Sequence, residues 1–279
     1  MKITCWGVRG SIPVSGAEYT RYGGDTTCFE VQGDDGTRLI LDAGTGIRVL
    51  GKRLIEEQAT ECHLLLTHTH WDHIIGLTAF APIFLEDLTI TVPVLPSQME
   101  QLERSLETLF TAPTFPVPFT RVNQRLSFEP VGDTKLTIGS LKIDSIPISH
   151  PNGGLGYRIT EEEKSLVFLT DNELGMVHPG GVDMKEYAQF VKGCDLLLHD
   201  AEYTPEEYEP RRGWGHSSWP DALTLAQEAG VKRLGFIHHN ADHSDATVDA
   251  MVEACRHTIR RKGLALTCFA VSPGTPMTL

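Results

Sequence analysis

The sequence predicts a layered α/β sandwich, and three observations support this fold class. Short runs rich in valine, isoleucine and leucine alternate with helical stretches that end at glycines. The runs form two similar series, each followed by helices, which is typical of sheets whose outer faces are covered by helices. The chain has 279 residues, 41% of them hydrophobic, enough to bury a sizeable core. We expect one domain over residues 1–279, made of two halves that meet near 145–160.

The strands are predicted from short apolar runs between turn residues. In chain order they cover residues 3–7, 28–32, 39–42, 63–67, 88–94, 135–138, 142–146, 156–159, 165–169, 195–199, 233–237 and 266–271. Three helices are predicted from capping pairs in which an acidic residue follows the cap by three positions. The pairs are Ser97 with Glu100, Asp183 with Glu186, and Ser218 with Asp221. Two further helices are expected over 47–58 and 246–262.

Residues 79–125 differ from the rest of the chain because six prolines surround a single helix. We interpret this stretch as an excursion from the sandwich that forms a lid or a partner surface. Its helix carries an apolar stripe, and further phenylalanines follow; these residues are Leu102, Leu106, Leu109, Phe110, Phe115 and Phe119. The stripe favours a homodimer, and the alternative is that it packs on the chain's own sandwich.

Charge and hydropathy weigh against nucleic acid and membranes as partners. The chain has 24 Lys and Arg against 37 Asp and Glu, a formal net charge of −13. Nucleic acid and anionic membranes generally require a basic face, although a locally positive metal site is still allowed. No apolar run is long enough to span a membrane, and no signal peptide is visible in residues 1–20. The six cysteines have no disulfide framework spacing, so we expect a cytoplasmic protein with reduced cysteines.

The strongest chemical signal is a cluster of histidines and an aspartate directly after the strand predicted at 63–67. It reads Thr67-His68-Thr69-His70-Trp71-Asp72-His73. On a turn that leaves a strand, His68 and His70 project in one direction, while Asp72 and His73 turn away as a helix begins. Imidazole and carboxylate together suit zinc, and also iron or manganese. Two diverging pairs of ligands predict two adjacent metal ions.

Further ligands are expected at the ends of later strands. His150, Asp171 and His238 each follow a predicted strand. Loops at strand ends converge on one edge of a sandwich, where functional residues gather. His239, directly after His238, is the alternative ligand at that position.

Together these residues resemble the metallo-β-lactamase-fold hydrolases. The segments 6–13, 22–27 and 41–46 are similar to the branch that holds ribonuclease Z and metal-dependent cyclic-nucleotide phosphodiesterases. The resemblance implies a four-layer αβ/βα sandwich of two similar halves with a dinuclear metal site on its edge. Two positions depart from the family's pattern, because Asp25 replaces the usual asparagine of a Gly-Gly-Asn loop and Asn240-Ala241 replaces Asp-Pro.

The resemblance also implies a role for each ligand. One metal ion would be held by His68, His70 and His150. The other would be held by Asp72, His73 and His238, and Asp171 would bridge the two. Asp72 is also expected to be one of the catalytic residues.

A second group of residues distinguishes phosphodiesterases from other members of the family. His216 lies in a glycine-rich segment before a predicted helix, and Asp200 follows the strand at 195–199. In ribonuclease Z-like enzymes a matching histidine, held by a carboxylate, protonates the leaving oxygen. An imidazolium held by Asp200 can supply that proton. The alternative is that His216 only anchors the helix cap at Ser218.

The sequence therefore predicts a dinuclear-metal phosphodiesterase, with zinc as the expected metal and manganese or iron as alternatives. The expected substrate is a small anionic phosphodiester such as a cyclic nucleotide. A tRNA 3′-processing endoribonuclease ranks lower, because residues 79–125 lack the basic, glycine- and proline-rich arm of ribonuclease Z. A thioester, lactone or β-lactam hydrolase of the same fold would not need His216. A metal-bearing binding or redox module is the non-hydrolytic alternative.

Overall fold

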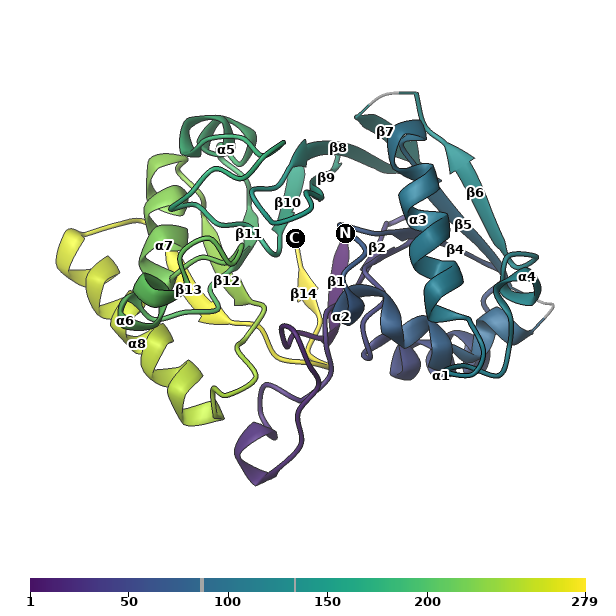
Figure 1. The fold of residues 1–279 in the computed structure, drawn as a ribbon. Helices are drawn as coiled ribbons and strands as arrows, with labels where there is room; N and C mark the ends of the chain where they lie inside the picture. Colours follow the sequence, from purple (N-terminus) through teal and green to yellow (C-terminus); the bar gives the residue numbers. More distant parts are fainter. Residues whose placement is uncertain (86–87, 133) are drawn as a thin grey trace.

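Two seven-stranded β-sheets lie between two layers of helices in the computed structural model, which describes residues 1–85, 88–132 and 134–279 (Figure 1). The first sheet has the strand order β14-β1-β2-β3-β4-β5-β6, and the second has the order β13-β12-β11-β10-β9-β8-β7. The strands of the first sheet are β1 (Lys2–Gly7), β2 (Cys28–Gln32), β3 (Arg38–Leu41), β4 (Glu61–Leu65), β5 (Thr89–Val94), β6 (Leu126–Pro130) and β14 (Met277–Thr278). The strands of the second sheet are β7 (Lys135–Ile138), β8 (Leu141–Pro147), β9 (Leu155–Glu161), β10 (Lys164–Leu169), β11 (Leu196–Asp200), β12 (Arg233–Ile237) and β13 (Thr267–Ala270).

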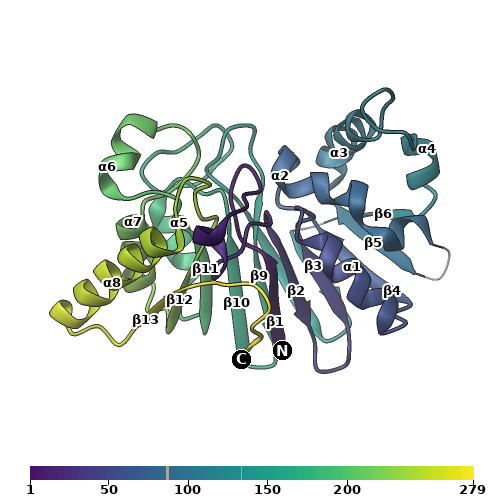
Figure 2. The same cartoon turned by 90° about the horizontal axis from the view of Figure 1, so that it is seen from below.

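Helices cover the outer face of each sheet, as the view along the sandwich shows (Figure 2). The helices on the side of the first sheet are α1 (Ile47–Glu56), α2 (Trp71–Ile74), α3 (Pro96–Leu109) and α4 (Phe119–Val122). The helices on the side of the second sheet are α5 (Met184–Phe190), α6 (Pro205–Tyr208), α7 (Trp219–Glu228) and α8 (Asp245–Lys262).

The hydrophobic core is divided into three layers by the two sheets. Successive side chains of a strand point to opposite faces of its sheet. In β3, Ile40 therefore packs with the helices of the first half, while Leu39 and Leu41 pack in the layer between the sheets. In β10, Phe168 joins this middle layer and Val167 packs with the helices of the second half. Strands covered on both faces are apolar throughout, and this arrangement confirms the four-layer αβ/βα sandwich.

The directions of the strands determine where the loops gather. Strands β10, β11, β12 and β13 are parallel, and β8 runs the same way as β10 because β9 is antiparallel to both. The carboxyl ends of parallel strands meet at one edge of a sheet, where ligand sites of open α/β sheets form. In Figure 2, helices α2 and α6 lie at the upper edge of the sandwich, and both chain termini lie at the lower edge.

One prediction about the organisation of the chain is corrected, and the structure adds two strands. The chain passes from the first sheet to the second between β6 and β7, earlier than the expected 145–160. Strands β6 and β14 were not predicted, because both lie at sheet edges and neither alternates clearly between buried and exposed residues. The C-terminal β14 returns to the first sheet and pairs with β1, where Ile3 lies opposite Met277.

The interpretation of residues 79–125 as an excursion is wrong in part. Strand β5 lies inside the first sheet, between β4 and β6. On helix α3, Leu102 and Leu106 are buried in the same core cluster as β5, together with Phe110 directly after the helix. The buried part of the apolar stripe thus packs on the chain's own sandwich, which was the alternative, and Leu109 and Phe115 are partly buried against the same cluster.

Two of the three predicted residues, Asp183 and Ser218, stand at the N-cap position of their helices. Asp183 accepts a 3.0 Å hydrogen bond from the backbone N–H of Glu186, and the two residues form a full capping box. At α3 the cap at Ser97 is wrong, because the helix begins one residue earlier, at Pro96, with no side-chain cap. Proline has no backbone N–H. At the first helical position that N–H would have no partner within the helix, so no hydrogen bond is lost. Ser218 caps α7 without a side-chain bond to the backbone.

The six cysteines are free and buried, as expected. Over the described ranges, no helix has the length and apolarity that crossing a membrane requires.

Candidate metal centre

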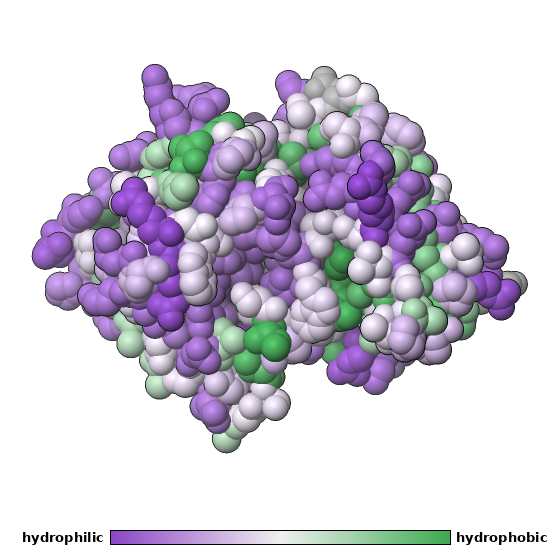
Figure 3. Space-filling model, in the orientation of Figure 1, coloured by the Kyte–Doolittle hydropathy of each residue, from purple (hydrophilic) through white to green (hydrophobic). Residues whose placement is uncertain are grey.

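The predicted ligands come together at the edge of the sandwich that carries α2. Figure 3 looks onto this edge, where the surface between the two lobes is hollowed and mostly hydrophilic. His68 and His70 lie in the loop after β4, and Asp72 and His73 lie in α2. The remaining predicted residues follow β8, β10 and β12, end β11 or precede α7; they are His150, Asp171, His238, Asp200 and His216.

Four overlapping groups of potential metal ligands form there among the described residues, and two of them also include His216. The seven ligands predicted from the sequence make up the other two groups, which we call the first and second clusters. The first consists of His68, His70 and His150, and the second consists of Asp72, His73, Asp171 and His238. Within each cluster, one ligand atom from every residue lies within 4.8 Å of the others. Every member is buried except His70, which is half-buried.

Asp171 belongs to the second cluster and also approaches the first. Its Oδ1 atom is 3.7 Å from Nε2 of His68 and 3.3 Å from Nε2 of His238. Its Oδ2 atom is 3.2 Å from Nε2 of His73. Asp72 approaches only the second cluster, with Oδ2 at 3.3 Å from His73 and 3.4 Å from His238. One carboxylate is thus placed to contact ions in both clusters.

The donor atoms fit a bound divalent cation. Nε2 of His68, of His73 and of His238 is buried without a hydrogen-bond partner among the described residues. Leaving a buried polar atom without a partner is costly, and here three such atoms surround the same carboxylate. A metal ion would satisfy their lone pairs, and nitrogen and oxygen donors are the ligands that zinc, iron and manganese accept.

The other ring nitrogens hold the imidazoles in orientation. Nδ1 of His73 lies 2.8 Å from Oδ2 of Asp42, and Nδ1 of His150 donates to the Gly215 carbonyl at 2.9 Å. Asp42 accepts two further hydrogen bonds from the backbone and side chain of Thr67. Such partners orient the metal ligands of a site. Sequence reasoning missed Asp42 in this role, although it lies in the segment 41–46 that carries the family resemblance.

Three residues of the site have left-handed backbone conformations. Asp42, Asp171 and His238 have φ angles of 61°, 52° and 58°. Residues other than glycine seldom adopt this region, and strained positions of this kind cluster at functional sites.

The electrostatic environment differs across the site. Burial and the nearby His73 lower the pKa of His68 well below its ordinary value, and burial lowers the pKa of His150 to about 4. Both rings are therefore neutral near pH 7, the form in which histidine binds a metal. Burial also acts to lower the pKa of His73, but the carboxylates of Asp171, Asp72 and Asp42 outweigh it and raise that pKa.

His216 and Asp200 form a buried pair beside the clusters. Nδ1 of His216 lies 2.8 Å from Oδ2 of Asp200 and 3.3 Å from Oε2 of Glu202. Burial acts to lower the pKa of His216, but Glu202 and Asp200 outweigh it and raise the pKa to about 9. Glu202 also lies 3.0 Å from Nδ1 of His238. Sequence reasoning missed Glu202, although it stands two residues after Asp200.

The surroundings of His238, His239 and Asp25 differ. His238 lies in the second cluster, whereas Nε2 of His239 lies 3.1 Å from the carbonyl of Val271. Asp25 takes part in the N-terminal loop, where its side chain accepts a 2.8 Å hydrogen bond from the hydroxyl of Thr45.

Glu173 organises the loop that carries His216. This fully buried carboxylate accepts hydrogen bonds from Tyr208 and from the backbone of Gly213 and Gly215, and it lies 2.7 Å from Nε2 of His178. Gly215 in turn orients His150 through its carbonyl. Burial acts to raise the pKa of Glu173, but these partners outweigh it and lower the pKa.

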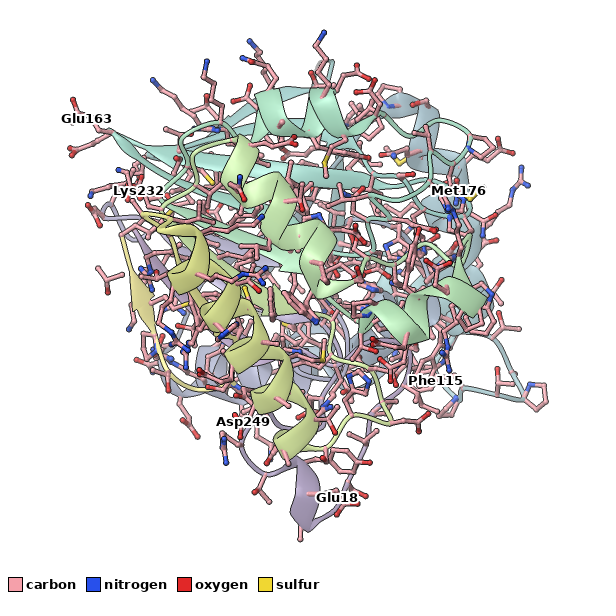
Figure 4. The ribbon with its side chains drawn as sticks, turned by 90° about the vertical axis from the view of Figure 1, so that its left-hand side faces the viewer. Glu18, Phe115, Glu163, Met176, Lys232 and Asp249 are labelled. Carbon is pink, nitrogen blue, oxygen red and sulfur yellow. The ribbon has the colours of Figure 1, made fainter. Side chains whose placement is uncertain are left out.

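We expect Glu173→Gln to lower the free energy of unfolding by about 1–3 kcal/mol, because the amide replaces one acceptor oxygen with a donor that faces other donors. Urea denaturation of the purified protein measures this change. Glu163→Gln is the matched control, since Glu163 extends into solvent on the side of the molecule away from Met176 (Figure 4). Equal stability of the two variants would show that the Glu173 network does not hold the loop.

The fold and the histidine–aspartate clusters define a metallo-β-lactamase-fold hydrolase. The chain belongs to the beta-lactamase superfamily, because the family model described as "Beta-lactamase superfamily domain" matches residues 37–239. Its curated relatives include the ribonuclease Z of Haloarcula marismortui, which is 22% identical over 92% of this chain and 91% of that protein. The family resemblance predicted from the sequence is thereby confirmed.

Solved structures share the fold over the whole chain. The metallo-beta-lactamase fold protein YhfI from Bacillus subtilis has a TM-score of 0.72 and 18% identity, with 99% of this chain and 98% of that chain covered. A diphosphatase from the PhnP family has a TM-score of 0.68 and 17% identity, with 100% and 97% covered.

Proposed function

We propose that this chain is a two-metal phosphodiesterase that cleaves small phosphodiesters such as cyclic nucleotides. The observation that carries the proposal is the Asp200–His216 pair at the candidate metal centre. The His216 ring lies 5.2 Å from the ring of His150 and 4.7 Å from that of His238, on which it stacks. A proton donor is therefore held beside both ligand clusters.

The proposed ligands of one ion are His68, His70 and His150. Asp72, His73 and His238 would hold the other, and Asp171 would contact both. Zinc is the proposed metal, with manganese or iron as alternatives. When bound, the two ions supply Lewis-acid stabilisation of the phosphate oxygens and a hydroxide nucleophile at neutral pH.

The side chains around the ions have distinct tasks. His216 donates a proton to the leaving alkoxide, which departs poorly without one. Asp200 holds the ring through Nδ1, so that Nε2 carries the proton to be transferred, and Glu202 adds negative charge that favours the imidazolium. Asp72 is held by the backbone N–H of Ser11 at 2.8 Å. Thioester or β-lactam hydrolysis would depend less on a proton from His216 than phosphodiester cleavage does.

The acidic character of the chain supports a small substrate. The net charge is −13, and gripping a long RNA requires many basic contacts. Within the described residues, the stretch 79–125 supplies strand β5 of the first sheet, and helices α3 and α4 pack in the same core cluster. The described part of this stretch does not form a basic arm. A tRNA-processing ribonuclease is the second candidate, because the curated relatives are named ribonuclease Z.

A substrate panel tests the proposal. Protein of quantified metal content is assayed with cyclic mono- and dinucleotides, tRNA precursors and thioesters, and kcat/KM is compared. We expect the highest value for a cyclic nucleotide. A higher value for the tRNA precursor would establish the ribonuclease instead, and turnover of thioesters alone would overturn both phosphodiesterase candidates.

A further inference from the structure

A mainly apolar cavity opens beside the candidate metal centre. It lies between the ends of β4 and β5, helix α3 and the strands β7 to β9. His68 and Thr69 line it, so the loop that supplies two of the proposed metal ligands also forms one wall of the cavity.

The cavity is joined to the ligand cluster by direct contacts. Asn152, in its lining, places its side-chain amide 3.2 Å from Nε2 of His70. Thr69, also in the lining, accepts a 3.1 Å hydrogen bond from the hydroxyl of Ser105 in α3, which lies outside the lining. A molecule whose phosphate lies at the metal ligands can therefore extend its remaining part into the cavity.

The lining is uncharged. Its floor is built from aliphatic side chains of the sheets, including Leu65, Val92 and Ile143. Its polar side chains include the neutral amides of Gln98 and Gln101 on α3, neither of which has a hydrogen-bond partner in the described part of the chain. None of the described lining residues is Lys, Arg, Asp or Glu. Burying a charged group against such walls would cost free energy. An uncharged polar group could instead form hydrogen bonds with the side-chain amides of the two glutamines.

We propose that this cavity binds the nucleobase of a nucleotide phosphodiester while the phosphate lies at the metal ligands. A nucleobase matches the cavity in three respects: it is flat, it carries no charge, and its edge offers donors and acceptors to amide side chains. This inference rests on the proposed function. It concerns the nucleobase, the part of the substrate that the metal ligands would not contact.

Two esters with the same leaving group separate recognition of the nucleoside from the chemical step, and a variant of the cavity then locates the base. Thymidine 5′-(p-nitrophenyl phosphate) and methyl p-nitrophenyl phosphate carry the same charge and release the same nitrophenolate. We expect kcat/KM for the thymidine ester to be higher by roughly tenfold or more, as burial of one ring implies.

Gln101→Trp tests the location of the base. Gln101 is exposed on α3, where tryptophan is tolerated in a helix, and the indole would fill the mouth of the cavity. We expect the ratio of the two kcat/KM values to fall to about threefold or less, mainly through KM of the thymidine ester. Glu103→Trp is the matched control, because Glu103 is exposed on the same helix outside the lining, and it should keep the wild-type ratio.

The outcomes separate this inference from the function on which it rests. Base binding in the cavity would be overturned if the ratio of the two kcat/KM values were near one in the wild type, or equal in the two variants. The proposed phosphodiesterase activity would still stand. Failure of the metal-loaded protein to cleave either ester would overturn the proposed function and this inference with it.

Discussion

Asp171→Asn is expected to lower the metal content from two ions per chain to one or fewer and to reduce phosphodiester turnover by about 10³-fold or more. The loss reflects several kcal/mol of transition-state stabilisation that a dinuclear centre supplies. Asp171 is the carboxylate that approaches both clusters, and without its charge two adjacent cations repel each other. Asparagine tolerates the left-handed conformation of this position, so the change tests the charge rather than the backbone.

Metal analysis by mass spectrometry after dialysis, combined with a turnover assay, measures both effects. Asp195→Asn is the matched control, because Asp195 is also buried but binds Ser165 and Lys232 outside both clusters. It should keep two ions per chain. Two ions retained in Asp171→Asn would refute the bridging role, and a single ion in the reconstituted wild type would refute the dinuclear centre itself.

His216→Ala is expected to reduce turnover of a cyclic nucleotide by about 10²–10⁴-fold, the usual contribution of a positioned general acid. The metal content should stay the same, because His216 lies outside the proposed ligand sets. The loss should shrink for a p-nitrophenyl phosphodiester, since nitrophenolate leaves without a proton. It should be largest for a ribose alkoxide.

Steady-state kinetics on the two substrates, with metal content determined for each preparation, distinguishes the roles of His216. His243→Ala is a suitable control, because His243 is another buried histidine paired with a carboxylate, that of Glu207 at 2.8 Å. Equal losses on both substrates would mean that His216 positions the substrate or supports the fold. Loss of metal in the variant would place His216 among the ligands.

Local sequence determined the elements and the chemistry of this protein. Strands such as β2 and β12 were predicted with the bounds that the structure has, because apolar runs between turn residues depend only on neighbours along the chain. The segment 68–73 identified the candidate metal centre because four potential ligands share one turn and one short helix. The later strand-end residues His150, Asp171 and His238 were identified by their position after apolar runs.

Tertiary structure alone decided which side chains support the site. Asp42 orients His73 from 31 positions away, and Glu202 contacts His238 from 36 positions away. A carboxylate after a strand looks alike in sequence whether it binds a metal, orients a histidine or faces solvent. Only the pairing of strands distant in the chain determines which of these it does.

The same reason explains the errors about residues 79–125 and the last strand. An amphipathic stripe such as Leu102 and Leu106 shows that one face of α3 is covered, but its period does not tell what covers it. The covering surface is the chain's own sheet, formed by β5 and its neighbours. Likewise, β14 is a strand only because β1 lies beside it. Local patterns in the chain thus indicate which residues are buried and which can bind metal, whereas packing between distant segments sets the partners of each.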